Sequence, residues 1–74
     1  MKERLIIISK FLTNREKEIF ELLVDNKTTK EVANILNISE KTVRNHISNV
    51  IQKLSVNTRY HALVELIKNG DIKI

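Results

Sequence analysis

Hydrophobic residues recur at helical spacing along most of this chain. The clearest stripe lies in residues 40–54, where the steps are four, three and four: Val43, Ile47, Val50 and Leu54. This spacing predicts one apolar face on a helix with about 3.6 residues per turn. The opposite face carries polar side chains only: Lys41, Asn45, Ser48 and Gln52, with Arg44 on its flank. The stretch therefore predicts a helix that is buried on one side and exposes basic and amide groups on the other.

Two earlier helices are predicted from capping residues. Thr13 with Glu16, and Thr28 with Glu31, have the three-residue spacing of a capping box. Thr29 is an alternative cap for the second of these helices. The apolar residues expected to face inward are Ile19, Phe20, Leu22 and Leu23 in the first helix, and Val32, Ala33, Ile35 and Leu36 in the second. The small side chain of Ala33 would let the next helix cross close by.

A turn and a fourth helix complete the predicted fold. Asn37 tolerates a left-handed backbone, so it can end the second helix, and Ser39 can cap the third. The fourth helix begins at Asn57 or Thr58 and stops at residues 69–70, which are Asn and Gly. No strand-like alternation of useful length is found. We therefore expect an all-α fold with four helices.

The composition fits one small domain. Its 74 residues and 42% hydrophobic content lie near the lower limit for a stable core, and there is no Cys for a disulfide or a thiolate metal site. The apolar run Leu5–Ile8 is too short for a signal peptide or a membrane span. We expect an N-terminal arm at residues 1–10, a domain at residues 11–74, no membrane contact and a cytoplasmic location.

The net charge of +4 is concentrated in one part of the chain. Basic and acidic residues cancel in residues 1–26. Residues 27–53 carry most of the excess, with Lys27, Lys30, Lys41, Arg44 and Lys53 against Glu31 and Glu40. A local basic excess is what nucleic-acid binding requires, although solvated surfaces can show it too.

The residues that catalysis needs are missing from the pattern. The two histidines, His46 and His61, are fifteen residues apart on different predicted helices, and neither has a carboxylate at ligand spacing. No Cys nucleophile and no Gly-rich phosphate loop is present. We therefore expect no enzyme activity, no cofactor, no metal and no small-molecule ligand.

A set of residues at fixed spacings adds a family resemblance. The set comprises Leu12-Thr13, Arg15-Glu16, Glu31-Val32-Ala33, Ile38-Ser39, Thr42 to Ile47, Lys53-Leu54 and Arg59. Residues 11–70 thereby resemble the LuxR-type DNA-binding domain. The resemblance implies a helix-turn-helix at about residues 28–54, with the third helix as recognition helix and the fourth as dimer helix. It also implies a structural pairing role for Arg15 and Glu16.

Two further features bear on the resemblance. Most members of the family carry an additional receiver or ligand-sensing domain and are longer than this chain. Its length is instead similar to that of stand-alone members that act in late spore formation. Ser55 stands where the family commonly has Gly or a polar residue, so we expect a different shape at the end of the third helix.

The candidate contact residues follow from the exposed face and from the resemblance. The first turns of a recognition helix lie deepest in the major groove. The candidates for base contact are Lys41, Arg44, Asn45 and Ser48. The candidates for contact with the DNA backbone are Lys27, Thr28, Thr29, Lys30, Thr42, His46, Lys53 and Arg59. Several have alternatives. Arg44 can hold a phosphate or be solvated, and Asn45 can be solvated. Thr42 can bond within the first turn of its helix, and His46 can pack in the structure or read a base. Lys53 or Arg59 can be solvated or form an internal ion pair.

Two candidate surfaces concern protein partners. The fourth helix has more apolar residues than a small core needs, which suggests a homodimer through Tyr60, Leu63, Val64 and Ile67 or a simple core cover. An acidic face on the first helix, formed by Glu16, Glu18, Glu21 and Asp25, is either a contact for RNA polymerase or a solvated surface. We expect a sequence-specific regulator that binds double-stranded DNA. The alternatives are a fragment like sigma-factor region four and a protein-binding helix-turn-helix adaptor.

Overall fold

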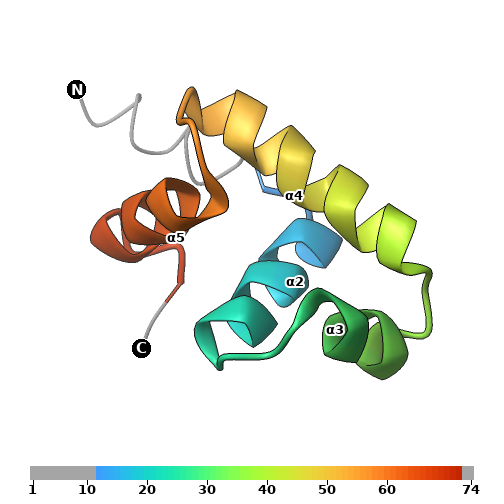
Figure 1. The fold of residues 1–74 in the computed structure, drawn as a ribbon. Coiled ribbons are helices and arrows are strands. Elements are labelled where there is room, and N and C mark those ends of the chain that lie inside the picture. Colours follow the sequence, from blue (N-terminus) through green and yellow to red (C-terminus); the bar gives the residue numbers. More distant parts are fainter. Residues whose placement is uncertain (1–11, 73–74) are drawn as a thin grey trace.

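The computed structural model describes residues 12–72, which form four helices and no strand (Figure 1). The helices are α2 (Asn14–Val24), α3 (Thr29–Leu36), α4 (Glu40–Leu54) and α5 (Arg59–Lys68). The all-α prediction is confirmed for this part of the chain. The expected arm at residues 1–10, with its apolar run, lies outside the described residues.

Each helix begins at a predicted capping residue. Two capping boxes are formed, by Thr13 with Glu16 and by Thr28 with Glu31. In each, the threonine hydroxyl accepts a hydrogen bond from the backbone amide of the glutamate, and the glutamate carboxylate accepts one from the backbone amide of the threonine. Ser39 caps α4 and Thr58 caps α5. These bonds satisfy amide groups that the first turn leaves without partners, so the chain's short polar residues set where its helices start.

The longest helix, α4, organises the fold. It packs against α2, α3 and α5, and Figure 1 shows it lying across the first two with α5 beside its C-terminal half. Three residues of its apolar stripe are buried as predicted, with Val43 and Val50 fully covered and Ile47 6% exposed, and Leu54 at the end of the stripe is partly buried against the core. The buried apolar side chains of the core are Ile19, Phe20, Val32, Ala33, Val43, Ile47, Val50, Ala62, Leu66 and Ile72. One face of α4 is thereby fixed inward and the other is left to solvent.

Two core assignments differ from the sequence prediction. Ile35 was expected to face inward, but it is 54% exposed because α3 turns Val32 and Ala33 toward α4 instead. Ile72 was not predicted as a core residue, yet it is 1% exposed. It follows α5, where the backbone amides of Asp71 and Ile72 both donate to the carbonyl of Leu66 and turn the chain back.

Left-handed residues end two of the helices. Asn37 has φ 58° and ψ 45° and closes α3, as predicted, and the Ile38 amide then donates to the Ala33 carbonyl. Ser55 has φ 56° and ψ 43° and closes α4. The different helix end expected at Ser55 is therefore wrong. The serine adopts the left-handed conformation that glycine favours.

The left-handed serine leads to a stability prediction. We expect Ser55→Gly to raise the free energy of unfolding by about 0.5–1 kcal/mol, because removing Cβ relieves a left-handed cost of about 1–2 kcal/mol, partly offset by the flexibility of glycine when unfolded. Asn37→Gly is the matched control and should gain less, since Asn tolerates this region better. Urea denaturation measures both. An unchanged or lower midpoint for Ser55→Gly would contradict the assignment.

A partly buried ion pair connects α2 to α4. The Glu16 side chain is 4% exposed, and its Oε1 lies 2.7 Å from Nζ of Lys53, whose side chain is 32% exposed. Burial raises the pKa of Glu16, but the hydrogen bonds from Lys53 and Thr13 and the charges of Lys53 and His46 outweigh it, so the pKa lies below its ordinary value. Glu16 therefore joins two helices, which agrees with its expected structural role, whereas Arg15 pairs with Glu18 on its own helix. The predicted place of Glu16 on an exposed acidic face is wrong.

Candidate nucleic-acid interface

The polar face of α4 is open to solvent. Lys41, Asn45 and Ser48 are exposed, as is Gln52 one turn further on. The Arg44 side chain is 61% exposed, and its guanidinium lies 3.5 Å from the Glu40 carboxylate one turn earlier. An exposed i,i+4 pair of this kind is weak, so Arg44 remains available to a stronger partner. All four predicted base-contact residues thus lie on one exposed surface.

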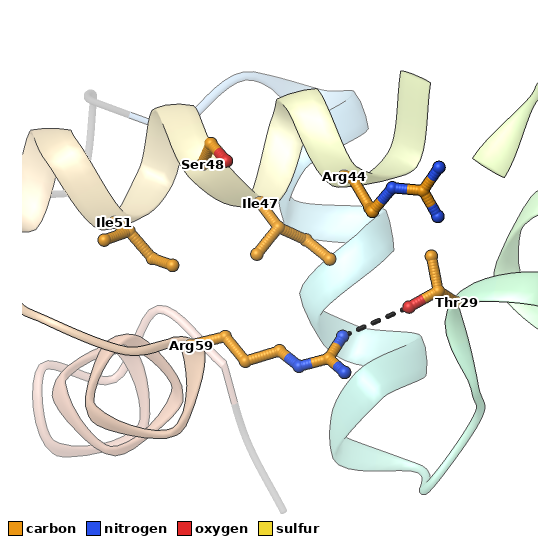
Figure 2. Close-up of a pocket in the computed structure, with 6 residues that line it drawn as sticks. All are labelled: Thr29, Arg44, Ile47, Ser48, Ile51 and Arg59. Atoms are coloured by element: carbon orange, nitrogen blue, oxygen red, sulfur yellow. Dashed lines mark hydrogen bonds between the residues drawn. The ribbon is translucent and has the colours of Figure 1, made fainter. Parts of the chain in front are cut away.

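A hollow of about 250 Å³ borders this surface. It is lined by residues from the starts of α3 and α5 and from the middle of α4: Thr29, Arg44, Ile47, Ser48, Ile51 and Arg59. Figure 2 shows the guanidinium group of Arg59 reaching Thr29 and that of Arg44 lying on the other side of Thr29, with Ile47 and Ile51 further along α4. The structure therefore brings two predicted base-contact residues, Arg44 and Ser48, together with two predicted backbone-contact residues, Thr29 and Arg59.

A hydrogen bond holds one side of the hollow. Nη1 of Arg59 donates to Oγ1 of Thr29 over 3.2 Å, across thirty residues of sequence. Thr29 is the first residue of α3, where amide groups and the helix dipole favour an anion. Two guanidinium groups beside a helix N-terminus can hold a phosphate oxygen, because Arg presents a planar fork of donors. The arrangement suits one phosphate of a nucleic-acid backbone.

The remaining backbone candidates lie in several places. Lys30 is exposed at the start of α3, while Lys27 is half-buried and lines a second hollow with Tyr60. The Thr28 side chain is already engaged in the capping box. The hydrogen bonds with Thr28 keep the pKa of the Glu31 carboxyl below its ordinary value, and the charge of Lys27 adds a smaller effect in the same direction.

Three candidates have internal contacts. Thr42 is half-buried; its amide donates to the Ser39 hydroxyl, and the two hydroxyl oxygens are 2.9 Å apart. His46 is half-buried and near enough to Glu16 for its charge to lower that pKa. Lys53 forms the ion pair with Glu16, which is the internal pairing that the sequence left open. A DNA contact by any of the three remains a prediction.

The predicted dimer residues form a partly exposed strip on α5. Tyr60 is 70% exposed, and Leu63, Val64 and Ile67 are half-buried. Leu63 and Ile67 also pack against the core cluster. Both readings of α5, core cover and partner contact, therefore have residues in their favour.

The short α3, the left-handed turn at Asn37 and the longer α4 with its open basic face define a helix-turn-helix DNA-binding domain. The chain belongs to a family described as bacterial regulatory proteins of the luxR family, which matches residues 10–66. It is a DNA-binding transcription regulator of that family. The resemblance drawn from the sequence is confirmed.

Comparison with individual proteins supports the same family assignment. The chain is 57% identical to the spore germination protein GerE of Bacillus subtilis (strain 168) over 74 residues, which is all of both chains. It is 49% identical to the transcriptional regulatory protein DegU of Brevibacillus brevis over 63 residues, 85% of this chain but 27% of DegU. A solved structure of the transcription factor GerE superposes with a TM-score of 0.83 at 56% identity, covering 85% of this chain and 94% of that chain.

Other types of site are not seen in residues 12–72. No group of three or more His, Cys, Asp or Glu side chains in this range could hold a metal ion. None of the described helices is long and apolar enough to cross a membrane. The relatives named above are regulators rather than enzymes.

Removing Arg59 tests the hollow as a phosphate site. We expect Arg59→Ala to weaken binding to all duplexes to a similar degree and to reduce the slope of log K against log salt by about 1 for each bound subunit, the signature of one lost phosphate contact per subunit. Lys68→Ala, which removes a charge from the exposed end of the same helix, should leave the slope unchanged. Fluorescence anisotropy over a salt series measures both. An unaltered slope for Arg59→Ala would exclude the contact.

Proposed function

We propose that this protein binds specific sequences in double-stranded DNA as a homodimer and regulates genes of late spore formation. The main support is the exposed N-terminal half of α4, where Lys41, Arg44, Asn45 and Ser48 share one face and the apolar stripe behind them is buried. In this geometry the first turns of α4 lie in the major groove. The hollow at Arg59 then holds a flanking phosphate.

The four exposed residues have side chains suited to base edges. A guanidinium can bind both acceptors of a guanine, and an amide can bind both polar groups of an adenine. Arg44 is therefore assigned to a guanine and Asn45 to an adenine. Lys41 and Ser48 extend the same contact along the groove, with the backbone candidates positioning the helix.

The dimer assignment rests on α5. Tyr60 is largely exposed although it is aromatic, and it adjoins the half-buried Leu63. Pairing of two α5 helices about a two-fold axis would cover both residues and add a contact for this small core. Two recognition helices would then meet half-sites about 10 base pairs apart or at another spacing compatible with the groove.

The sporulation assignment rests on likeness to GerE, which matches this chain over its whole length. We expect the protein to act in the cytoplasm, where bacterial DNA lies, and to need no cofactor. RNA polymerase is the natural further partner of a regulator that binds promoters.

Selection of bound sequences from a random duplex pool tests this function. The expected result is one preferred motif with two inverted half-sites, together with a salt slope of about −4 to −5 if five or so phosphates are neutralised. Sedimentation should show a dimer, whereas a fragment like sigma region four would be a monomer. A pool without enrichment, or a slope near zero, would defeat the proposal and favour a protein-binding adaptor.

A further inference from the structure

A separate hollow lies between α2 and α3. Its volume is about 380 Å³, and it shares no residue with the candidate nucleic-acid interface. We call it the acidic groove, and its lining residues are Glu18, Glu21, Leu22, Asp25, Ile35 and Leu36. Three of the six are carboxylates and none is basic.

The acidic groove combines two features that are unusual together. Ile35 is 54% exposed, and Ile35 and Tyr60 are the exposed large hydrophobic residues of the described chain. Glu18, Glu21 and Asp25 lie at steps of three and four, so they follow one side of α2 over about 10 Å. Glu18 pairs with Arg15 at 3.5 Å, whereas Glu21 and Asp25 form no ion pair within residues 12–72. An aliphatic anchor is thus exposed beside carboxylates.

The charge decides what the groove can bind. A DNA phosphate would be repelled by three carboxylates within about a Debye length of 10 Å. The groove therefore stays uncovered when α4 lies on DNA. A protein segment with Lys or Arg around one apolar side chain would pair with the carboxylates and cover Ile35.

We propose that the acidic groove binds a basic segment of RNA polymerase that carries an apolar side chain, while α4 holds the DNA. This inference rests on the proposed function, because polymerase meets the groove only on DNA that the protein has bound. Ile35 supplies the apolar contact. Glu21 and Asp25 supply the charges that orient the incoming segment.

The test uses the full chain, purified RNA polymerase holoenzyme and a promoter duplex that carries the selected motif. Ile35→Ala and Glu21→Lys are compared with two controls, Asn34→Ala on the exposed part of α3 outside the groove and Glu65→Lys on α5. We expect both groove variants to weaken polymerase binding to the protein–DNA complex about fivefold or more. The two controls should match the wild type.

Two further measurements separate the possible outcomes. DNA affinity without polymerase should be the same for Ile35→Ala and Asn34→Ala, and for Glu21→Lys and Glu65→Lys, and circular dichroism should show all four folded. Groove variants that bind DNA and still bind polymerase like their controls would overturn the inference, as would a wild type that binds DNA but not polymerase. A wild type that does not bind DNA would instead defeat the proposed function.

Discussion

Replacing Arg44 by alanine is expected to lower affinity for the preferred duplex by about 5- to 150-fold for each half-site that the dimer contacts. This range corresponds to about 1–3 kcal/mol for one bidentate base contact. The side chain is 61% exposed, and its internal partner is the exposed Glu40, so its removal should not unfold the domain. Preference at a single base pair of each half-site should be lost at the same time. Anisotropy with the selected duplex and with single-base variants of it measures both effects.

Two matched variants show whether the loss in Arg44→Ala comes from a base contact or from the charge alone. Arg44→Lys keeps the charge but loses the planar fork of donors, so base preference should weaken while the salt slope is retained. Lys68→Ala removes a charge whose side chain is 68% exposed and should change neither quantity. If Arg44→Lys kept full base preference, Arg44 would be a phosphate contact and its assignment to a guanine would be wrong.

Replacing Lys53 by alanine should have the largest effect on stability among the charged residues discussed. It leaves the buried Glu16 carboxylate without the ammonium group at 2.7 Å, which we expect to reduce the free energy of unfolding by about 1–3 kcal/mol. The partial exposure of Lys53 keeps this below the loss for a fully buried pair. Urea denaturation provides the measurement, with Lys68→Ala as a control that should stay within about 0.5 kcal/mol of the wild type.

The pH dependence of stability tests the same ion pair. Because folding lowers the pKa of Glu16, its contribution is complete above the unfolded pKa of about 4.3 and is lost as the pH falls through the lower folded value. The free energy of unfolding of the wild type should therefore decline below about pH 4, and Glu16→Gln should lack that part of the decline. Equal slopes for the two proteins would show that Glu16 does not titrate as described.

The two roles considered for Lys53 give different results. If Lys53 acts only through Glu16, folded Lys53→Ala should bind DNA with the wild-type salt slope. If it also holds a phosphate, the slope should fall by about 1. Glu16→Gln provides the comparison, because it disturbs the pair and leaves the lysine charge in place.

The features that the sequence predicted well are local. Thr13, Thr28 and Ser39 cap their helices through bonds to residues three positions on, and the stripe from Val43 to Val50 repeats within one helix. The exposed face of α4 follows from that stripe by helical geometry alone. Fold class and the exposure of the base-contact candidates could therefore be predicted without a structure, while the contacts themselves remain predictions.

The features that escaped the sequence depend on packing between distant residues. Glu16 meets Lys53 across 37 residues, and Arg59 meets Thr29 across 30. Neither pair has a periodic signal, so the partners could not be named, although the resemblance implied a structural role for Glu16 and an internal pair was left open for Lys53. Ile35 is apolar and at helical spacing, yet the orientation of α3 exposes it. Periodicity identifies an apolar residue but not the helix that will cover it.

The most direct test of the central claim is an NMR titration of the isotopically labelled protein with its selected duplex. We predict that the largest changes in amide and side-chain shifts occur at Lys41, Arg44, Asn45 and Ser48, with smaller changes around Thr29 and Arg59. The acidic groove should change least. Shifts concentrated on α5 or in the acidic groove, with the exposed face of α4 unaffected, would contradict the claim that α4 reads the DNA.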